Sequence, residues 1–171
     1  MIEAKAVGEP DDMREGEVAV EVPAQFDASL YYIGRIHTPW KQCEDCPRNP
    51  RESDAVCTVV VDPRWVKGLQ GLETVSHVVV LYWMDRARRD LVLQAPRHYA
   101  ELRGTFALRS PVRPNPIALA AARLLRIEGN VLTVVGLDCV DGTPLLDLKP
   151  YFASTDSVPE AAVGWHSARK R

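Results

Sequence analysis

The chain has 171 residues, a length typical of one domain that buries a hydrophobic core without cross-links. Its 21 basic and 23 acidic residues give a formal charge of −2, so any RNA contact must come from local basic patches rather than from a global positive field. No apolar run is long enough to cross a bilayer, and the N-terminus lacks the pattern of a secretion signal, so we expect a cytoplasmic protein.

The first half of the chain contains two predicted strands joined by a long loop. The N-terminal segment, residues 1–28, is polar and acid-rich, and the weak alternation at residues 17–22 indicates a short extra strand or a mobile arm. Leu30–Ile36 and Ala55–Val61 are rich in β-branched and aromatic residues, which predicts a strand in each. The charged, proline-containing loop Trp40–Asp54 is long enough to indicate a role beyond connection.

The chain has four cysteines, of which Cys43 and Cys46 form a Cys-x-x-Cys pair. A structural zinc site needs two further ligands at matching spacing, and only scattered candidates such as Cys57, Cys139 and His37 are present. A redox pair is expected after a strand and before a helix, whereas this segment resembles a loop. We therefore expect reduced thiols and no metal site.

The apolar run Val75–Met84 is the best candidate for a central strand. His77, near its start, is interpreted as a hydrogen-bonded structural histidine, with a catalytic role as the alternative.

Basic side chains cluster after this strand. The cluster comprises Arg86, Arg88, Arg89, Arg97, His98 and Arg103, with Tyr99 among them. Basic and aromatic mixtures of this kind contact RNA phosphates and bases. A solvated charged surface is an equally good explanation.

The segment Phe106–Pro116 carries three prolines within six residues. Proline fixes φ and removes a backbone donor, so the segment is neither helix interior nor central strand, and we expect an ordered loop. Arg109, Arg113 and Asn115 on so stiff a loop have little backbone freedom to lose, which suits a ligand site. A rigid surface turn with solvated arginines is the alternative.

The sequence pattern in the last third of the chain predicts three more strands. Ile117–Ile127 has alanines that favour a helix, but a short glycine-containing segment separates it from Val131–Val135, which is the arrangement of a hairpin. A turn at Asp141–Pro144 then precedes a final strand that ends at Tyr151. Many short strands, long loops and little helix predict a mainly β protein, a single-domain closed or nearly closed β-barrel.

Asp147 and Lys149 are two residues apart on this final strand and would share one face. Either they pair with each other at the surface, where the pair contributes little, or both point into a polar pocket.

Several of these phrases together resemble the TsaA-like, TrmO-type proteins. The phrases are Gly104 through Arg113-Pro114-Asn115-Pro116-Ile117, Asp141-Gly142-Thr143-Pro144, Lys149-Pro150-Tyr151, Tyr32–Pro39 and Gly68–His77. The resemblance implies a TsaA-like barrel domain over residues 29–159, followed by a tail over 160–171. It also implies a methyltransferase that uses S-adenosyl-L-methionine and methylates N6 of threonylcarbamoyladenosine next to a tRNA anticodon.

The resemblance further implies which residues line the cofactor site. They are Pro50, Arg51, Glu52, Asp85, Arg86, Arg109, Leu119, Asp141, Gly142, Thr143 and Pro144. Arg109 suits the methionine carboxylate, because a guanidinium pairs bidentately with carboxylates. Asp141 and the backbone of Gly142 and Thr143 suit the remaining cofactor groups, since glycine permits close approach. Asp85 stands where the family commonly has a histidine.

Arg113, Asn115 and Arg97 are candidates for substrate contact, with shaping of the loop as the alternative for the first two. The acceptor amine must lose a proton, and Asp147, Tyr151 and His77 are candidate bases. The resemblance implies a tRNA partner and a homodimer with the cofactor site near the subunit interface.

Longer relatives carry an extra C-terminal domain, whereas this chain ends about 20 residues after Tyr151. Either the barrel alone binds tRNA or the substrate differs. The alternatives are an S-adenosylmethionine-binding homodimeric module without catalysis, and a methyltransferase for another RNA or a small molecule.

Overall fold

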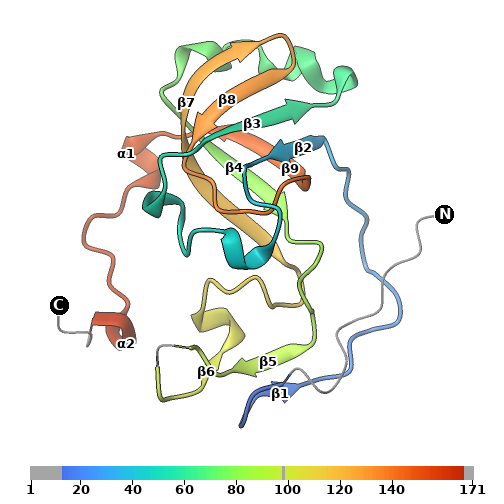
Figure 1. Ribbon diagram of the computed structural model, residues 1–171, viewed down its shortest axis with the longest axis vertical. Helices are drawn as coiled ribbons and strands as arrows, with labels where there is room; N and C mark the ends of the chain where they lie inside the picture. The colour runs from blue at the N-terminus through green and yellow to red at the C-terminus, as the bar shows by residue number, and fades with distance from the viewer. Residues whose placement is uncertain (1–12, 98, 168–171) are drawn as a thin grey trace.

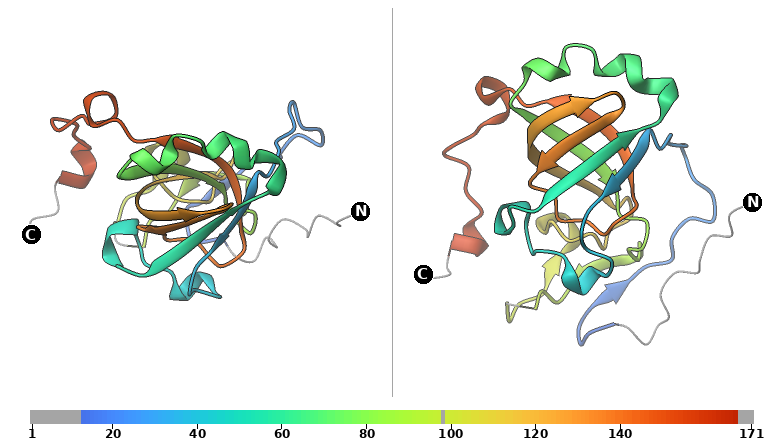
Figure 2. Two further views of the ribbon diagram at one scale, coloured as in Figure 1. Left: turned by 90° about the horizontal axis from the view of Figure 1, so that it is seen from above. Right: turned by 45° about the horizontal axis from the view of Figure 1, so that its top comes forward.

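A closed antiparallel β-barrel forms the body of the molecule in the computed structural model, which describes residues 13–97 and 99–167 (Figures 1 and 2). Its strands follow one another around the barrel in the order β2-β3-β8-β7-β4-β9, and β9 pairs with β2 to close it. Their bounds are β2 Gly34–His37, β3 Val56–Val61, β4 His77–Trp83, β7 Ile117–Glu128, β8 Val131–Val135 and β9 Thr143–Pro150. The predicted mainly β barrel is confirmed.

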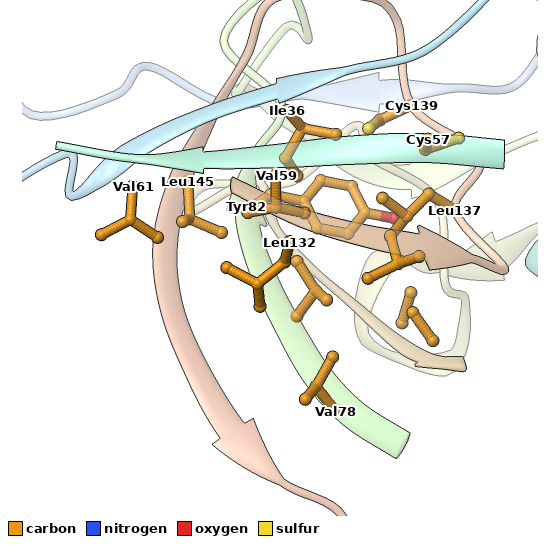
Figure 3. Packing of buried hydrophobic residues seen from close by; sticks show 14 of the residues in the cluster. Ile36, Cys57, Val59, Val61, Val78, Tyr82, Leu132, Leu137, Cys139 and Leu145 are labelled. Atoms are coloured by element: carbon orange, nitrogen blue, oxygen red, sulfur yellow. The ribbon is translucent and has the colours of Figure 1, made fainter. Parts of the chain in front are cut away.

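Alternating side chains of these strands fill the barrel. In β4, for example, Val78, Val80 and Tyr82 are at most 2% exposed, because successive residues of a strand point to opposite faces. The other buried core residues include Ile36, Cys57, Val59, Val61, Ala120, Ala122, Leu132, Val134, Leu137, Cys139 and Leu145. Figure 3 shows the Tyr82 ring within this cluster, with its hydroxyl directed toward Leu137.

A second, smaller sheet lies beside the barrel, at the bottom of Figure 1. It has the order β1-β5-β6, with β1 Val18–Ala19, β5 Leu91–Gln94 and β6 Arg103–Gly104. β5 and β6 belong to the excursion between β4 and β7, and β1 comes from the N-terminal segment. The N-terminal segment thus contributes the two-residue strand β1, within residues 17–22, whereas β5 and β6 were not predicted.

Among residues 13–97 and 99–167, helical structure occurs only in short pieces. The 3₁₀ helices are η2 Cys43–Asp45, η3 Pro50–Glu52, η4 Pro63–Leu69, η5 Leu72–Thr74 and η6 Thr105–Ala107, and the α-helices are α1 Ala153–Asp156 and α2 Gly164–Ser167. Within the described part of the chain, no helix has the length and apolar character needed to span a membrane.

The predicted first strand differs most from the observed one. It was expected over Leu30–Ile36, but β2 begins at Gly34, and Leu30 is 57% exposed. Upstream of β2, a backbone bond from Ile33 N to Leu145 O of 2.9 Å extends the contact with β9 by one residue. The ambiguous run after Pro116 is a twelve-residue strand, β7, as predicted, despite its alanines.

The strand pairing gives the barrel two different ends. At the first, which we call the loop end, three long connections emerge: residues 38–55, 84–116 and 136–142. The three connections lie at the same end because the strand residues next to them are paired across the barrel. These pairs are His37 with Thr58, Trp83 with Ile117, Val56 with Val135, and Ile36 with Thr143. At the other, which we call the turn end, lie residues 62–76 and the turn at 129–130 (top of Figure 1). The chain leaves this end after Pro150 and runs alongside the barrel to α2, whose Trp165 ring lies 5.1 Å from that of Tyr99.

Candidate functional site

The loop end collects the residues that the family resemblance predicts for the cofactor. The first connection contains Pro50, Arg51 and Glu52, the second Asp85, Arg86 and Arg109, and the third Asp141 and Gly142. Leu119 on β7 and Thr143 and Pro144 on β9 lie within the first three residues of their strands. These residues are up to 94 positions apart in sequence, from Pro50 to Pro144, and closure of the barrel places their segments at one end.

Arg109 is exposed but anchored. Its Nη2 donates a hydrogen bond of 2.9 Å to the carbonyl oxygen of Leu119 on β7. Among the described residues no carboxylate forms an ion pair with Arg109, and a guanidinium has five N–H donors. The side chain is thus held in place with donors left for an anionic ligand.

Asp141 ties two of the connections together. Its Oδ2 accepts from Lys41 Nζ at 2.6 Å, and its Oδ1 accepts from the backbone N–H of Thr38 at 3.2 Å and lies 3.1 Å from His37 Nδ1. These bonds, the one from Lys41 foremost, lower the pKa of Asp141 to about 2. The carboxylate is therefore ionised at neutral pH.

The backbone of the turn after Asp141 is already hydrogen-bonded within the protein. Gly142, with a φ of 82°, donates its N–H to Ile36 O at 2.8 Å, and Thr143 donates its N–H to Val140 O. Thr143 is 6% exposed, and Pro144 is also buried. Internal acceptors therefore use both N–H groups, and binding of the cofactor by the backbone of Gly142 and Thr143 stays a prediction.

Tyr82 and Asp138 form a hydrogen-bonded pair that the sequence did not predict. The hydroxyl of the buried Tyr82 donates to Asp138 Oδ1 at 2.5 Å. Burial raises the pKa of Tyr82, Asp138 adds to this rise, and the positive charge of Arg109 opposes it. Tyr82 therefore stays protonated and acts as a donor. Its inward position in β4 follows from strand alternation, but nothing in the sequence indicates Asp138 as its partner.

Arg89 fixes the proline-rich loop. It donates from Nε to Pro114 O at 2.6 Å and from Nη2 to Asn115 Oδ1 at 3.3 Å. Its guanidinium lies 5.1 Å from the ring centroid of Phe26 and 5.4 Å from that of Trp83. Asn115 thus contributes to the shape of the loop, as one of its two predicted roles required. Arg113, on the same loop, is half-buried.

The predicted residues of the first connection form a capped 3₁₀ turn. Asn49 Oδ1 accepts from Arg51 N at 2.9 Å, and the two oxygens of Glu52 accept from Asn49 Nδ2 at 2.6 Å and Arg48 N at 3.1 Å. Glu52 therefore stabilises its own loop. Arg51, like Asp85 of the second connection, is exposed to solvent.

Two candidate bases lie at the turn end. His77 begins β4, and its carbonyl accepts from Tyr151 N at 3.0 Å. The exposed His77 ring has its Nδ1 3.0 Å from Ser76 Oγ, as the structural interpretation expects. Six residue steps of about 3.3 Å separate His77 from Trp83 at the loop end, roughly 20 Å along the strand. The structure does not bring His77 or Tyr151 together with Arg109.

Asp147, the third candidate base, lies midway along β9, opposite Leu81. Its Oδ2 accepts from Lys149 Nζ at 2.6 Å, and the two side chains are 45% and 61% exposed. Of the two arrangements that the sequence allowed, the structure has the surface ion pair and not the polar pocket.

The predicted basic cluster is divided among several contacts. Arg88 forms a two-bond pair with Asp90 at 2.8 Å, and Arg103 pairs with Glu101 and lies 5.5 Å from the Trp165 ring centroid. Arg97 lines a cavity together with Arg109. His98 and the terminal Arg169-Lys170-Arg171 lie outside the described residues.

The cysteines are free thiols. Burial raises the pKa of Cys46 and of Cys57 to about 11 and that of Cys139 to about 12, so these thiols are protonated at neutral pH. Within residues 13–97 and 99–167, no group of three or more histidine, cysteine, aspartate or glutamate side chains is arranged to hold a metal ion.

Comparison with known proteins finds a family that matches most of the chain. The pattern that defines the tRNA-methyltransferase O N-terminal domain matches residues 35–157. A probable S-adenosyl-L-methionine-binding protein, VirR, from Rhizobium radiobacter is 46% identical over 147 residues, which cover 86% of this chain and 84% of VirR. A tRNA (adenine(37)-N6)-methyltransferase from Mus musculus is 41% identical over 98 residues, 56% of this chain and 23% of that protein.

A crystal structure of TrmO from Pseudomonas aeruginosa has the same fold. It superposes with a TM-score of 0.68 at 34% identity, and the match covers 81% of this chain and 62% of that one. The chain described here therefore spans less than two thirds of the solved relative.

Proposed function

Because the chain belongs to the family of the tRNA-methyltransferase O N-terminal domain, we propose that it is a methyltransferase that uses S-adenosyl-L-methionine as methyl donor. The observation that carries the proposal is the convergence of Arg109, Leu119 and Asp141 at one end of the barrel. The names of VirR and of the Pseudomonas TrmO support the donor and the reaction class.

The acceptor in this proposal is N6 of the adenosine next to a tRNA anticodon, in its threonylcarbamoyl form. The name of the mouse relative supports adenine N6 of tRNA as the acceptor. The threonylcarbamoyl group is what the resemblance to TrmO-type proteins implies.

The residues at the loop end fit the donor. The guanidinium of Arg109 pairs with its methionine carboxylate, since it is anchored on Leu119 O and has further N–H donors. The Leu119 side chain, 45% exposed, offers apolar surface to the adenine ring. The ionised carboxylate of Asp141 attracts the ammonium group or accepts from ribose hydroxyls.

The bound donor would supply a methyl group on a positively charged sulfur, which requires little covalent help from the protein. The chain's own contribution is to orient the donor and to exclude water, so that the acceptor nitrogen lies in line with the transferred methyl group. His77, Tyr151 and Asp147 are not part of this proposal, because the first two lie at the turn end and Asp147 is paired with Lys149.

We further propose that the protein acts as a homodimer in which the partner covers β7 near the cofactor. The outer face of β7 carries exposed apolar side chains at Ile117, Leu119 and Leu125, with exposed fractions of 42, 45 and 42%. Leu119 also belongs to the proposed cofactor site. A partner on this face would therefore close the site from outside.

A cofactor-binding module without catalysis is the second candidate. It is favoured by the name of VirR, which describes binding and no transfer. Such a module would also bind the donor through Arg109, but it would transfer no methyl group to an acceptor.

Mass spectrometry of tRNA nucleosides tests the proposal. tRNA from a strain that lacks this methylation is incubated with the protein and S-adenosylmethionine, and then digested. We expect threonylcarbamoyladenosine to gain the mass of one methylene group only when both are present. Binding of the donor in calorimetry without any methylated nucleoside would establish the module instead. A methyl group on another nucleoside would show that the protein acts on a different substrate.

A further inference from the structure

A cavity of about 630 Å³ opens beside the loop end, between the N-terminal segment and the excursion that joins β4 to β7. Its lining is formed by Met13, Arg14, Glu17, Arg88, Leu91, Gln94, Ala95, Pro96, Arg97, Leu108, Arg109, Ser110 and Val112. The first three residues precede residue 35, where the family match begins. This cavity is thus built partly from a segment outside the family domain.

Four arginines and one carboxylate line the cavity. Both oxygens of that carboxylate, Glu17, are engaged by backbone groups: Oε2 accepts from Arg14 N at 3.0 Å and Oε1 from Ala95 N at 2.9 Å. Glu17 therefore fixes the N-terminal segment against β5 and forms no ion pair with a lining arginine. Arg88 is neutralised by Asp90 at 2.8 Å.

The charge of Arg109 is assigned to the donor carboxylate in the proposed function, which leaves the charges of Arg14 and Arg97 for a second anion. In the part of the chain that the structure describes, none of these three arginines forms an ion pair with a carboxylate. Arg14 is held by a bond of 2.5 Å from Nη1 to Ala95 O, and Arg109 by its bond to Leu119 O. Two of the three are thus oriented in advance, which reduces the entropy lost on binding an anion.

We propose that this cavity binds backbone phosphates of the RNA substrate that flank the methylated nucleotide. The inference rests on the proposed function, because it assigns a binding site to the same substrate. Guanidinium groups pair bidentately with phosphate oxygens, and these charges lie on a protein whose overall charge is −2. The cavity therefore provides the local basic patch that an RNA substrate requires.

The neighbouring residues favour RNA over other anions. The Phe106 ring, in η6 directly before the lining residue Leu108, is 81% exposed. Exposed aromatic rings beside arginines are typical surfaces for stacking unpaired bases. Arg109 lines the cavity and also contacts β7, so RNA that is held there has its neighbouring base at the loop end.

The salt dependence of RNA binding tests this site without the cofactor. Binding of an RNA stem-loop with the sequence of the anticodon arm is measured by fluorescence anisotropy over a range of KCl concentrations. For Arg14→Ala and Arg97→Ala we expect weaker binding, and a salt slope that falls by about 0.7 to 0.9 for each phosphate that the variant no longer neutralises. The KM for tRNA should rise while the Kd of S-adenosylmethionine stays unchanged.

Arg126→Ala is the matched control, because Arg126 is an exposed arginine of β7 near the turn end that pairs with Glu128 at 2.8 Å. Circular dichroism confirms that each variant is folded.

The proposal is overturned if the slopes of both cavity variants equal that of the control, or if an acidic polypeptide competes as well as RNA does. If wild type transfers no methyl group but the slopes change, only the proposed function fails. If it methylates tRNA and the variants match the control, only this inference fails.

Discussion

Arg109 is a single side chain that is both exposed and held in one place. Because its guanidinium is anchored on Leu119 O, a ligand carboxylate meets donors that are already positioned. We expect Arg109→Ala to weaken S-adenosylmethionine binding by about 2 kcal/mol, a roughly 30-fold rise in Kd. Titration calorimetry measures this, with Arg126→Ala as the control. An unchanged Kd would place the donor carboxylate elsewhere.

The lowered pKa of Asp141, again a property of one residue, predicts that the stability of the fold depends on pH. Its pKa lies at about 2, below the ordinary value of 3.8, because Lys41, Thr38 and His37 stabilise the ionised form. A carboxyl group whose pKa is lower in the folded than in the unfolded protein stabilises the fold at pH values above its unfolded pKa. This contribution to stability is lost as the pH falls from about 4 toward 2. Carboxyl NMR titration should give about 2 for wild type and a higher value for Lys41→Ala.

The two proteins should also differ in urea unfolding. Between pH 4 and 2 wild type should lose more stability than Lys41→Ala, since it loses an additional ion pair. Titration of Asp141 near 3.8 in wild type would show that these bonds do not form in solution.

At the scale of the elements, the contact of β2 with β3 depends on Gly34. A Cβ at this position would lie 2.1 Å from Val60 O, a backbone atom that cannot move without separating the strands. We expect Gly34→Ala to destabilise the protein by about 3 kcal/mol and to lower its Tm by roughly 6 to 12 °C.

Gly68→Ala is the control for this substitution, because a Cβ at Gly68 has no neighbouring atom within 4 Å. Thermal denaturation of the two variants should separate them clearly. Equal melting temperatures would mean that β2 and β3 pair in a different register.

The strands of the barrel were predictable because each follows a local rule. In β3 and β4 every second residue is apolar and buried, and in β7 the following turn outweighed the helix preference of the alanines. β5 and β6 were missed because their pairing depends on distant partners: Leu93 pairs with Val18 and with Gly104. No periodicity within a four-residue strand reveals such partners.

The candidate site was predictable only in part for the same reason. The phrases around Arg109 and Asp141 could be recognised, but the carbonyl of Leu119, the pairing of Lys41 with Asp141 and that of Tyr82 with Asp138 depend on how the barrel closes. The candidate bases His77 and Tyr151 show the opposite case. Tyr151 was chosen by its position in the sequence, with His77 as a further candidate, but position in the sequence does not tell at which end of the closed barrel a residue lies.

At the scale of the whole molecule, the proposed dimer makes a direct prediction. If a partner covers β7, Ile117→Glu should convert a dimer into a monomer in sedimentation equilibrium and should lower methyl transfer. A buried charge at an apolar interface is unfavourable, whereas on a free surface it is harmless. Val158→Glu, at a side chain that is 57% exposed near α1, is the control. Full activity of a strictly monomeric wild type would refute the dimer.

Closure of the barrel also bears on how such a protein diversifies. Each of the three loop-end connections joins strands whose hydrogen bonds are already complete around the ring, so a change in the length of one connection need not shift the others. Under the proposed function, an insertion in residues 84–116 that leaves Arg109 in place would change the acceptor while Leu119, on the strand β7, stays fixed. The ring would thus let substrate choice change independently of donor binding.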